Sequence, residues 1–182
     1  LDGGDGNDWV VTILGDKAIT AGGVGRDWIF NTAKEGELWG DYAAGVAFTA
    51  STMVNVEQIA LADGNDYKLT LVDANNSSSL IVDGSLLTGT NTLHIDASAE
   101  TASALIALGG EGDDTLTRGN GADSFTGGKG ADIVTGGLGS DTVNYDGSAT
   151  GVTVDLNSAL AQSGGDAAGD KLSGIENAVG SA

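Results

Sequence analysis

The sequence predicts an all-β fold, a parallel β-roll or β-solenoid, and three observations lead to this prediction. A nine-residue pattern recurs along the chain, Gly accounts for 31 of the 182 residues, and Pro is absent. Repeats this short cannot bury a core alone, so they must stack on one another as the coils of a solenoid. Without Pro, the glycines cannot belong to a collagen-like or Pro-rich segment, and we assign them to turns.

The nonapeptide is clearest in four consecutive copies that run from Gly109 to Asn144 without a gap. They read GGEGDDTLT, RGNGADSFT, GGKGADIVT and GGLGSDTVN, with Asp in the sixth position of each. Two further copies lie near the start of the chain, GGDGNDWVV from Gly3 and GGVGRDWIF from Gly22. The hexapeptide GGxGxD is intact in five of these six copies, which is too often for chance in a chain of this length.

Each copy divides into a six-residue turn, rich in Gly and Asp, and a three-residue strand. Successive side chains of a strand point to opposite faces, so the middle residue of the three is expected to face the core. Two copies would then make one coil. The middle residue is apolar in all six copies: Val10, Ile29, Leu116, Phe125, Val134 and Val143.

The repeat pattern divides the chain into four expected parts. Residues 1–30 hold the first two turns, 31–108 form a metal-poor β-solenoid or a sandwich-like segment, 109–144 form the core roll, and 145–182 hold degenerate copies that continue into a longer protein. Apolar runs in the second part predict strands that begin near residues 46, 56, 67, 79, 92 and 104. Only LADGNDYKL, which starts at Leu61, keeps part of the turn pattern, in Gly64 and Asp66.

The charge of the chain makes cations the expected partners. Its net charge is −19, from 26 acidic and 7 basic residues, which excludes electrostatically driven binding to nucleic acid or to an anionic membrane. All but six of the acidic residues are Asp, whose short side chain suits turns and hard-metal sites. Cys is absent, which excludes disulfides and thiolate metal sites, and no apolar run is long enough to span a membrane.

The Asp and Gly of the turns together predict a calcium site. Coils of a parallel roll stack about 4.8 Å apart, so each Asp lies close to the Asp of the next coil, and the two carboxylates repel each other. A divalent cation between the coils converts this repulsion into coordination by carboxylate and carbonyl oxygens. Oxygen-only ligands favour calcium over magnesium and zinc. Gly is expected where the turn needs left-handed or strained dihedral angles.

On these motifs the chain resembles the RTX family, the Gly- and Asp-rich repeats of bacterial proteins exported by type I secretion. The resemblance implies a right-handed parallel β-roll that holds about two to four calcium ions, bound by Asp carboxylates and by the carbonyls of alternate turn residues. Carried over to this sequence, the implied ligands are Gly4, Gly6, Asp8, Gly23, Gly25, Asp27, Gly110, Gly112, Asp114, Gly119, Gly121, Asp123, Gly128, Gly130, Asp132, Gly137, Gly139 and Asp141.

In the family an ion lies between one turn and the turn two repeats later on the same edge. The resemblance therefore pairs the turns of Asp114 with Asp132, of Asp123 with Asp141, and of Asp8 with Asp27.

Two positions depart from the pattern. Arg118 replaces the first Gly of its copy and is expected either to distort the turn or to occupy an outer position. The slot two repeats after Asp132 falls on Thr150, so either this turn lacks a full partner or Asp146 or Asp155 replaces it.

No catalytic motif accompanies the repeats, and we expect the chain not to be an enzyme. His94 is the only His, so an HExxH zinc site is impossible, and no GxSxG motif occurs. The resemblance implies a module that folds on calcium binding, within a larger protein secreted by, or displayed on, a Gram-negative bacterium. Two alternatives stay open: a self-assembling or adhesive segment of an adhesin, surface-layer or filament-like protein, and a glycan-binding accessory module of a polysaccharide-modifying enzyme.

Overall fold

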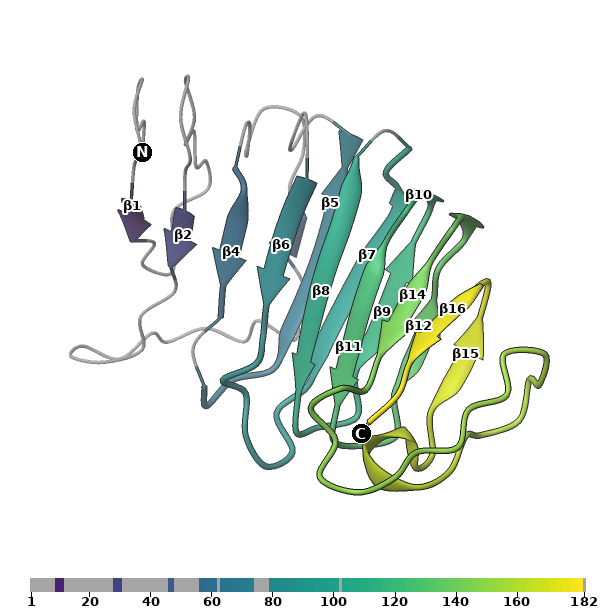
Figure 1. The fold of residues 1–182 in the computed structure, drawn as a ribbon. Helices are drawn as coiled ribbons and strands as arrows, with labels where there is room; N and C mark the ends of the chain where they lie inside the picture. Colours follow the sequence, from purple (N-terminus) through teal and green to yellow (C-terminus); the bar gives the residue numbers. More distant parts are fainter. Residues whose placement is uncertain are drawn as a thin grey trace.

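A computed structural model of the chain describes residues 56–61, 63–73, 79–101 and 103–181, together with the backbone of three short strands nearer the N-terminus. These strands are β1 (Trp9–Val11), β2 (Trp28–Phe30) and β3 (Val46–Ala47). Figure 1 shows successive strands stacked side by side along one axis. All the strands named in the two main sheets pair in parallel, which confirms the predicted parallel β-roll.

Apart from one two-stranded pair, the strands form two sheets. The first has the order β1-β2-β4-β6-β8-β11-β14-β16 and the second the order β15-β12-β9-β7-β5-β3. The first sheet is completed by β4 (Gln58–Ala60), β6 (Ser79–Asp83), β8 (Ala104–Gly110), β11 (Ser124–Gly128), β14 (Thr142–Asn144) and β16 (Asn177–Val179). The second is completed by β5 (Tyr67–Val72), β7 (Leu93–Ala99), β9 (Thr115–Arg118), β12 (Ile133–Thr135) and β15 (Lys171–Ser173). Because the chain alternates between these two sheets from β2 onward, each of these coils contributes one strand to each.

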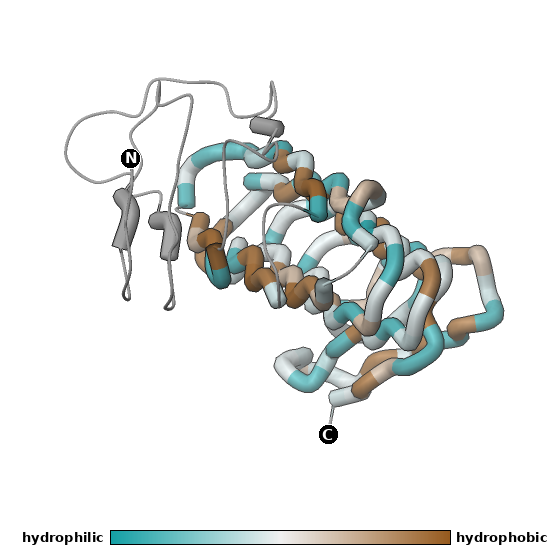
Figure 2. Tube along the Cα trace, turned by 90° about the horizontal axis from the view of Figure 1, so that it is seen from above, coloured by the Kyte–Doolittle hydropathy of each residue, from teal (hydrophilic) through white to brown (hydrophobic). Residues whose placement is uncertain are grey.

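The inward residues of the nonapeptide strands lie where the repeat predicts. Leu116, Phe125, Val134 and Val143 are at most 1% exposed and belong to the core between the two sheets. The remaining two predicted inward residues, Val10 and Ile29, lie in strands whose side chains are outside the described residues. Figure 2, which views the stack from above, shows hydrophobic residues recurring from one coil to the next.

The described strands from β4 to β8 belong to the same two sheets as the nonapeptide coils. The strands predicted near residues 46, 56, 67, 79, 92 and 104 correspond to β3 to β8. These coils are longer than the nonapeptide coils. Ile81 pairs with Ile106 of the next coil, whereas a shorter stretch of chain, equal to two nonapeptides, separates Ser124 from its partner Thr142.

After β14 the chain leaves the two sheets before it returns as β15. The intervening segment contains a 3-10 turn, η3 (Gly165–Ala167), and an antiparallel bridge between Thr153 and Ser163. On its return, Lys171 pairs with Ile133 of β12, so the last coil keeps the stacking register despite the insertion. No helix among the described residues is long and apolar enough to cross a membrane.

Candidate metal centre

The turns of the roll lie along two edges, which we name by the direction of the chain. Edge one holds the turns that lead from the first sheet to the second, and edge two holds the turns that lead back; β10 (Asn120–Gly121) and β13 (Leu138–Gly139) pair along edge two, at the upper side of Figure 1. The buried acidic residues of edge one are Asp114, Asp132 and Asp170. The turns of edge two hold Glu100, Asp123, Asp141 and Glu176.

The carboxylates of edge one form a ladder from coil to coil. Oδ1 of Asp132 accepts a hydrogen bond from the main-chain N–H of Asp114 at 2.8 Å. Oδ1 of Asp170 accepts the N–H of Asp132 at 2.9 Å, and Oδ1 of Asp114 accepts the N–H of Leu93 at 2.7 Å. Each carboxylate is therefore bound to the residue that stands one coil earlier in the same slot.

Edge two repeats this arrangement. Oδ1 of Asp141 accepts the N–H of Asp123 at 2.9 Å, and Oε2 of Glu176 accepts the N–H of Asp141 at 2.9 Å. Oδ1 of Asp123 accepts the N–H of Leu105 at 2.8 Å. The coils thus bring together the two pairs that the sequence predicts to share an ion, Asp114 with Asp132 and Asp123 with Asp141.

The second carboxylate oxygens are the part of the ladder that lacks partners. The Asp residues in the sixth position of the four nonapeptides are at most 2% exposed. Oδ2 of Asp123, Asp132 and Asp141 is buried without a hydrogen-bond partner, whereas Oδ2 of Asp114 accepts the N–H of Gly110 at 2.8 Å. A buried, unpartnered carboxylate oxygen is unfavourable unless a cation compensates it. These oxygens therefore fit a hard divalent ion.

The electrostatics of the turns also favours a positive partner. Burial raises the pKa of Asp132 to about 8, and the neighbouring carboxylates of Asp170 and Asp114 add to this effect. Burial likewise raises the pKa of Asp114 to about 6 and raises the pKa of Asp141. Without a cation, these carboxyls retain protons more strongly than free Asp does. Either a proton or a metal ion must neutralise them.

The carboxylates alone do not complete an ion site. Among the described residues, no group of three or more His, Asp or Glu side chains is placed to hold a metal. The close stacking of the turns places main-chain carbonyls on the same edge: a Cβ on Gly128 or Gly130 would overlap the carbonyl oxygen of Gly110 or Gly112, respectively, one coil earlier. This mixture of carboxylate and carbonyl oxygens is typical of calcium.

Some of the turn glycines adopt backbone angles that other residues rarely adopt. Gly128 and Gly130 have φ angles of +103° and +113°, in the left-handed region that was predicted for the turn glycines. Three further predicted ligand residues also have positive φ: Gly121, Gly137 and Gly139.

The left-handed part of the expectation for turn glycines, which was left-handed or strained dihedral angles, does not apply to Gly110, Gly112 and Gly119. Their φ angles lie outside that region, but a Cβ on any of them would overlap a main-chain carbonyl of the preceding coil. Close approach of the coils, rather than backbone strain, requires Gly there.

The other predicted ligands lie outside the described residues. They are Gly4, Gly6, Asp8, Gly23, Gly25 and Asp27.

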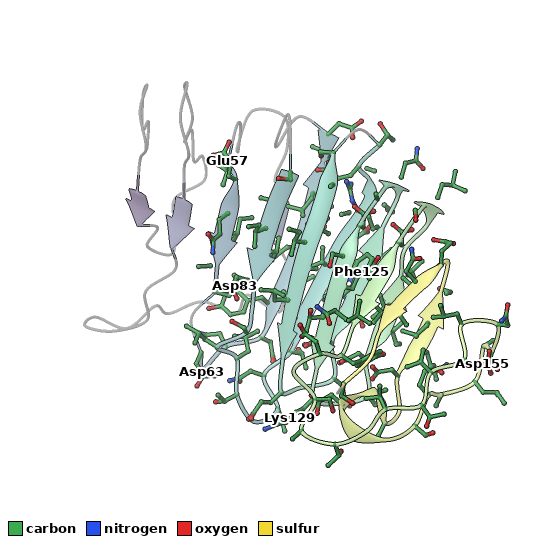
Figure 3. All side chains as sticks on the ribbon, in the orientation of Figure 1. Glu57, Asp63, Asp83, Phe125, Lys129 and Asp155 are labelled. Atoms are coloured by element: carbon green, nitrogen blue, oxygen red, sulfur yellow. The ribbon has the colours of Figure 1, made fainter. Side chains whose placement is uncertain are left out.

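Neither Asp146 nor Asp155 takes the place that one of them was expected to fill, two repeats after Asp132. Asp146 and Asp155 are exposed, and Figure 3 places Asp155 on the loop outside the two sheets. The slot is filled instead by Asp170, which is 1% exposed and whose Oδ2 accepts a hydrogen bond from the Tyr145 hydroxyl at 2.7 Å.

Sequence reasoning also missed Glu176, which takes the next slot on edge two. The segments DKLS, from Asp170, and ENAV, from Glu176, each place an acidic residue directly before a short strand, as the last four residues of the nonapeptide do. That signal could have identified both residues.

Arg118 does not occupy the expected outer position. Its side chain is buried, with the residue 3% exposed, and its Nε lies 3.1 Å from Oδ1 of Asp123. Its Nη1 lies 3.4 Å from Oε2 of Glu100. The turn keeps its place in the stack, because Gly121 pairs with Gly139 of the next coil.

The family comparison agrees with this geometry. The family model of the RTX calcium-binding nonapeptide repeat matches residues 1–12 and 108–144, with four copies. These residues carry RTX calcium-binding repeats. The longer match covers the turns whose carboxylates form the two ladders, so the ladders belong to a calcium-binding module. The RTX match does not reach the copy at Gly22, and no curated protein and no solved structure matches the chain.

Proposed function

We propose that the chain is a non-catalytic module of a larger secreted protein, in which calcium binding folds the nonapeptide coils. The observation that carries the proposal is the set of buried, unpartnered Oδ2 atoms of Asp123, Asp132 and Asp141. In the absence of a cation, folding must either leave these oxygens uncompensated or, as the raised pKa of Asp132 indicates, keep a proton on the carboxyl; both oppose folding near neutral pH, where Asp in the unfolded chain is ionised. A bound calcium ion removes that penalty, and because the unfolded chain has no formed site, the binding free energy becomes folding free energy.

Two ions are proposed for the central coils. One is held between the turns of Asp114 and Asp132 on edge one, and the other between the turns of Asp123 and Asp141 on edge two. Turn carbonyls complete each ligand set: those of Gly110, Gly112, Gly128 and Gly130 on edge one, and those of Gly119, Gly121, Gly137 and Gly139 on edge two. A third ion is proposed between the turns of Asp8 and Asp27, which gives about two to four ions per chain when the ends are counted.

The charge of the chain explains why such a module suits export. With a net charge of −19, the calcium-free chain repels itself and resists compaction. A chain that stays unfolded where calcium is scarce can pass through a secretion channel. Calcium outside the cell then folds it by mass action, which is the basis for proposing an extracellular or cell-surface location.

The test is a calcium titration of the chain followed by circular dichroism, starting in chelator and with magnesium in a parallel series. A gain of β-structure with calcium that magnesium does not reproduce is expected. A spectrum that is identical in chelator and in calcium would contradict the proposal.

The matched variants are Asp132→Asn and Asp146→Asn. Asn at 132 can still accept the N–H of Asp114 through its Oδ1 but offers no carboxylate to an ion, so the calcium concentration at the midpoint is expected to rise severalfold. Asp146 is exposed, and its substitution is expected to leave the midpoint unchanged. Equal midpoints for the two variants would count against the assigned ligands.

Sedimentation of the calcium-loaded chain distinguishes the folding module, which is expected to be monomeric, from a self-assembling segment, which would form oligomers.

A further inference from the structure

We infer that Arg118 takes the place of a calcium ion at the start of edge two, so that the junction between the upstream coils and the nonapeptide coils folds without calcium. The inference rests on the proposed function, because it concerns where the row of ions ends. The two are tested differently: the inference is tested by measurements in chelator alone, and the proposed function by the response to calcium.

The position of Arg118 in the repeat places its side chain among carboxylates. In the other three copies of the central block, the same slot is Gly109, Gly127 or Gly136, and a Cβ there would overlap the Oδ2 atom of that copy's own Asp. A side chain at this slot must therefore share the space of the carboxylate. In the second copy that side chain carries a positive charge, and its Nε donates a hydrogen bond to Oδ1 of Asp123 at 3.1 Å.

The opposing acid comes from the preceding coil. Glu100 lies in the edge-two turn between β7 and β8, directly before the turn of Asp123 in the stack: the N–H of Asn120 donates to the Glu100 carbonyl at 3.1 Å. Glu100 is 2% exposed, and its Oε2 lies 3.4 Å from Nη1 of Arg118. Two buried carboxylates from adjacent coils thus have one cation between them, which is the arrangement that calcium is proposed to provide one coil later.

No other described pair gives this protection to the calcium-free chain. Asp123 and Glu100 each keep one unpartnered oxygen but pair with Arg118 through the other, whereas no Lys or Arg ion pair with Asp132 or Asp141 is found in the described part of the chain. The second described ion pair of adjacent coils, Lys129 with Glu111 on edge one, is solvent-exposed, with 67% and 39% of the respective side chains accessible. Exposed pairs of this kind contribute little, whereas loss of one partner from a buried pair is strongly destabilising.

The consequence is a boundary of calcium dependence that falls at Arg118. In chelator, β8 should remain folded, because the N–H of Leu105 donates to a carboxylate that Arg118 has already neutralised. Strands β12 and β14, which follow turns whose carboxylates have no cation, should open. Calcium then extends the folded structure from this junction toward the C-terminus.

The experiment is hydrogen–deuterium exchange of the full chain in chelator, read at β8, for the wild type, Arg118→Met, the double variant Arg118→Met with Glu100→Gln, and Lys129→Met as control. The wild type and Lys129→Met are expected to protect β8 in chelator. Arg118→Met preserves length but removes the charge, and its β8 amides are expected to exchange roughly a hundredfold faster or more. The double variant, which has one buried carboxylate fewer, is expected to recover at least part of that protection.

Each other outcome would overturn the inference. If β8 of the wild type is unprotected in chelator, or if Arg118→Met protects it as well as the wild type does, then Arg118 does not replace an ion. If the single and double variants exchange equally fast, including the case in which both fail to fold, then Arg118 acts by packing rather than by charge. The proposed function fails by a different result, namely when calcium leaves the exchange of β12 and β14 in the wild type unchanged.

Discussion

The upstream coils, from β4 to β8, and the nonapeptide coils, from β9 to β14, share two sheets but are stabilised in different ways. Strand β5 buries Tyr67, Leu69 and Leu71, and β7 likewise buries three apolar side chains. Strands β9, β12 and β14 each bury only one, such as Leu116 in β9. Each fully buried aliphatic or aromatic side chain contributes about 1.5–3 kcal/mol. The nonapeptide coils therefore have a thinner apolar core, and in the proposed function calcium compensates their buried carboxylates.

Two acidic residues on edge one show what this difference means chemically. Asp63, in an upstream turn, is exposed, and its carboxylate accepts hydrogen bonds from Thr88 and Asn91, which hold its pKa at about 2. Asp132, in a nonapeptide turn, is buried and has one oxygen without a partner, and its pKa is raised to about 8. Burial and an unpartnered oxygen thus distinguish Asp132 from the exposed, fully bonded Asp63. Figure 3 shows Asp63 at the rim of the roll, whereas Phe125 lies between the sheets.

The largest effect is expected from a core truncation in the upstream coils. Ile95→Ala removes a fully buried side chain from β7 and should lower the free energy of unfolding of these coils by about 2–5 kcal/mol. Because their core contains no metal ligand, the loss should be similar in chelator and in calcium. Denaturant titrations under both conditions measure it. A loss that calcium largely restores would show that the upstream coils also depend on the ion.

An intermediate effect is expected from pH in chelator. Below about pH 4, Asp132 is protonated in both the folded and the unfolded chain. Between its ordinary pKa of 3.8 and its folded pKa of about 8, only the folded chain keeps the proton, so stability must fall as the pH rises through this window.

Denaturation of the nonapeptide coils at several pH values in chelator measures this fall. Excess calcium should abolish it above neutral pH, because calcium binds the deprotonated carboxylates. Stability in chelator that rises over the same window would refute the assignment of a raised pKa to Asp132.

The smallest effect is expected from the exposed turn of Asp63. Thr88→Val removes the hydroxyl that donates to Oδ2 of Asp63 at 2.7 Å, so the pKa of Asp63 should rise towards its ordinary value. The change in stability should be slight and independent of calcium, because this carboxylate lies in water. Titration of Asp63 by NMR gives the pKa, and thermal unfolding with and without calcium gives the stability. A calcium-dependent change would place an ion at this turn.

Much of the fold could be predicted because each nonapeptide marks both its turn and the inward-facing residue of its strand. The Gly and Asp positions mark the turns, and the apolar residue in the middle of each three-residue strand, such as Phe125 or Val134, marks the inward face. The same spacing predicted that Asp114 would lie next to Asp132 and Asp123 next to Asp141, as the main-chain hydrogen bonds between them confirm.

Asp170 could not be placed by counting. The segment after β14 interrupts the period, so a count of two nonapeptides onward from Asp132 falls on the exposed Thr150. Only the pairing of β15 with β12 brings Asp170 into the slot, where it accepts the N–H of Asp132.

The sequence by itself determined the period, the turn and strand positions within each repeat, and the acidic character that makes calcium the partner, because these are local properties repeated in tandem. Only the tertiary structure decided which side chains outside the repeat join its edges. Arg118 and Glu100 belong to differently built coils, and their pairing depends on how an upstream coil stacks on a nonapeptide coil. Stacking register is a property of the folded roll, and it decides whether a buried carboxylate forms an ion pair with an arginine or has no cationic side chain beside it.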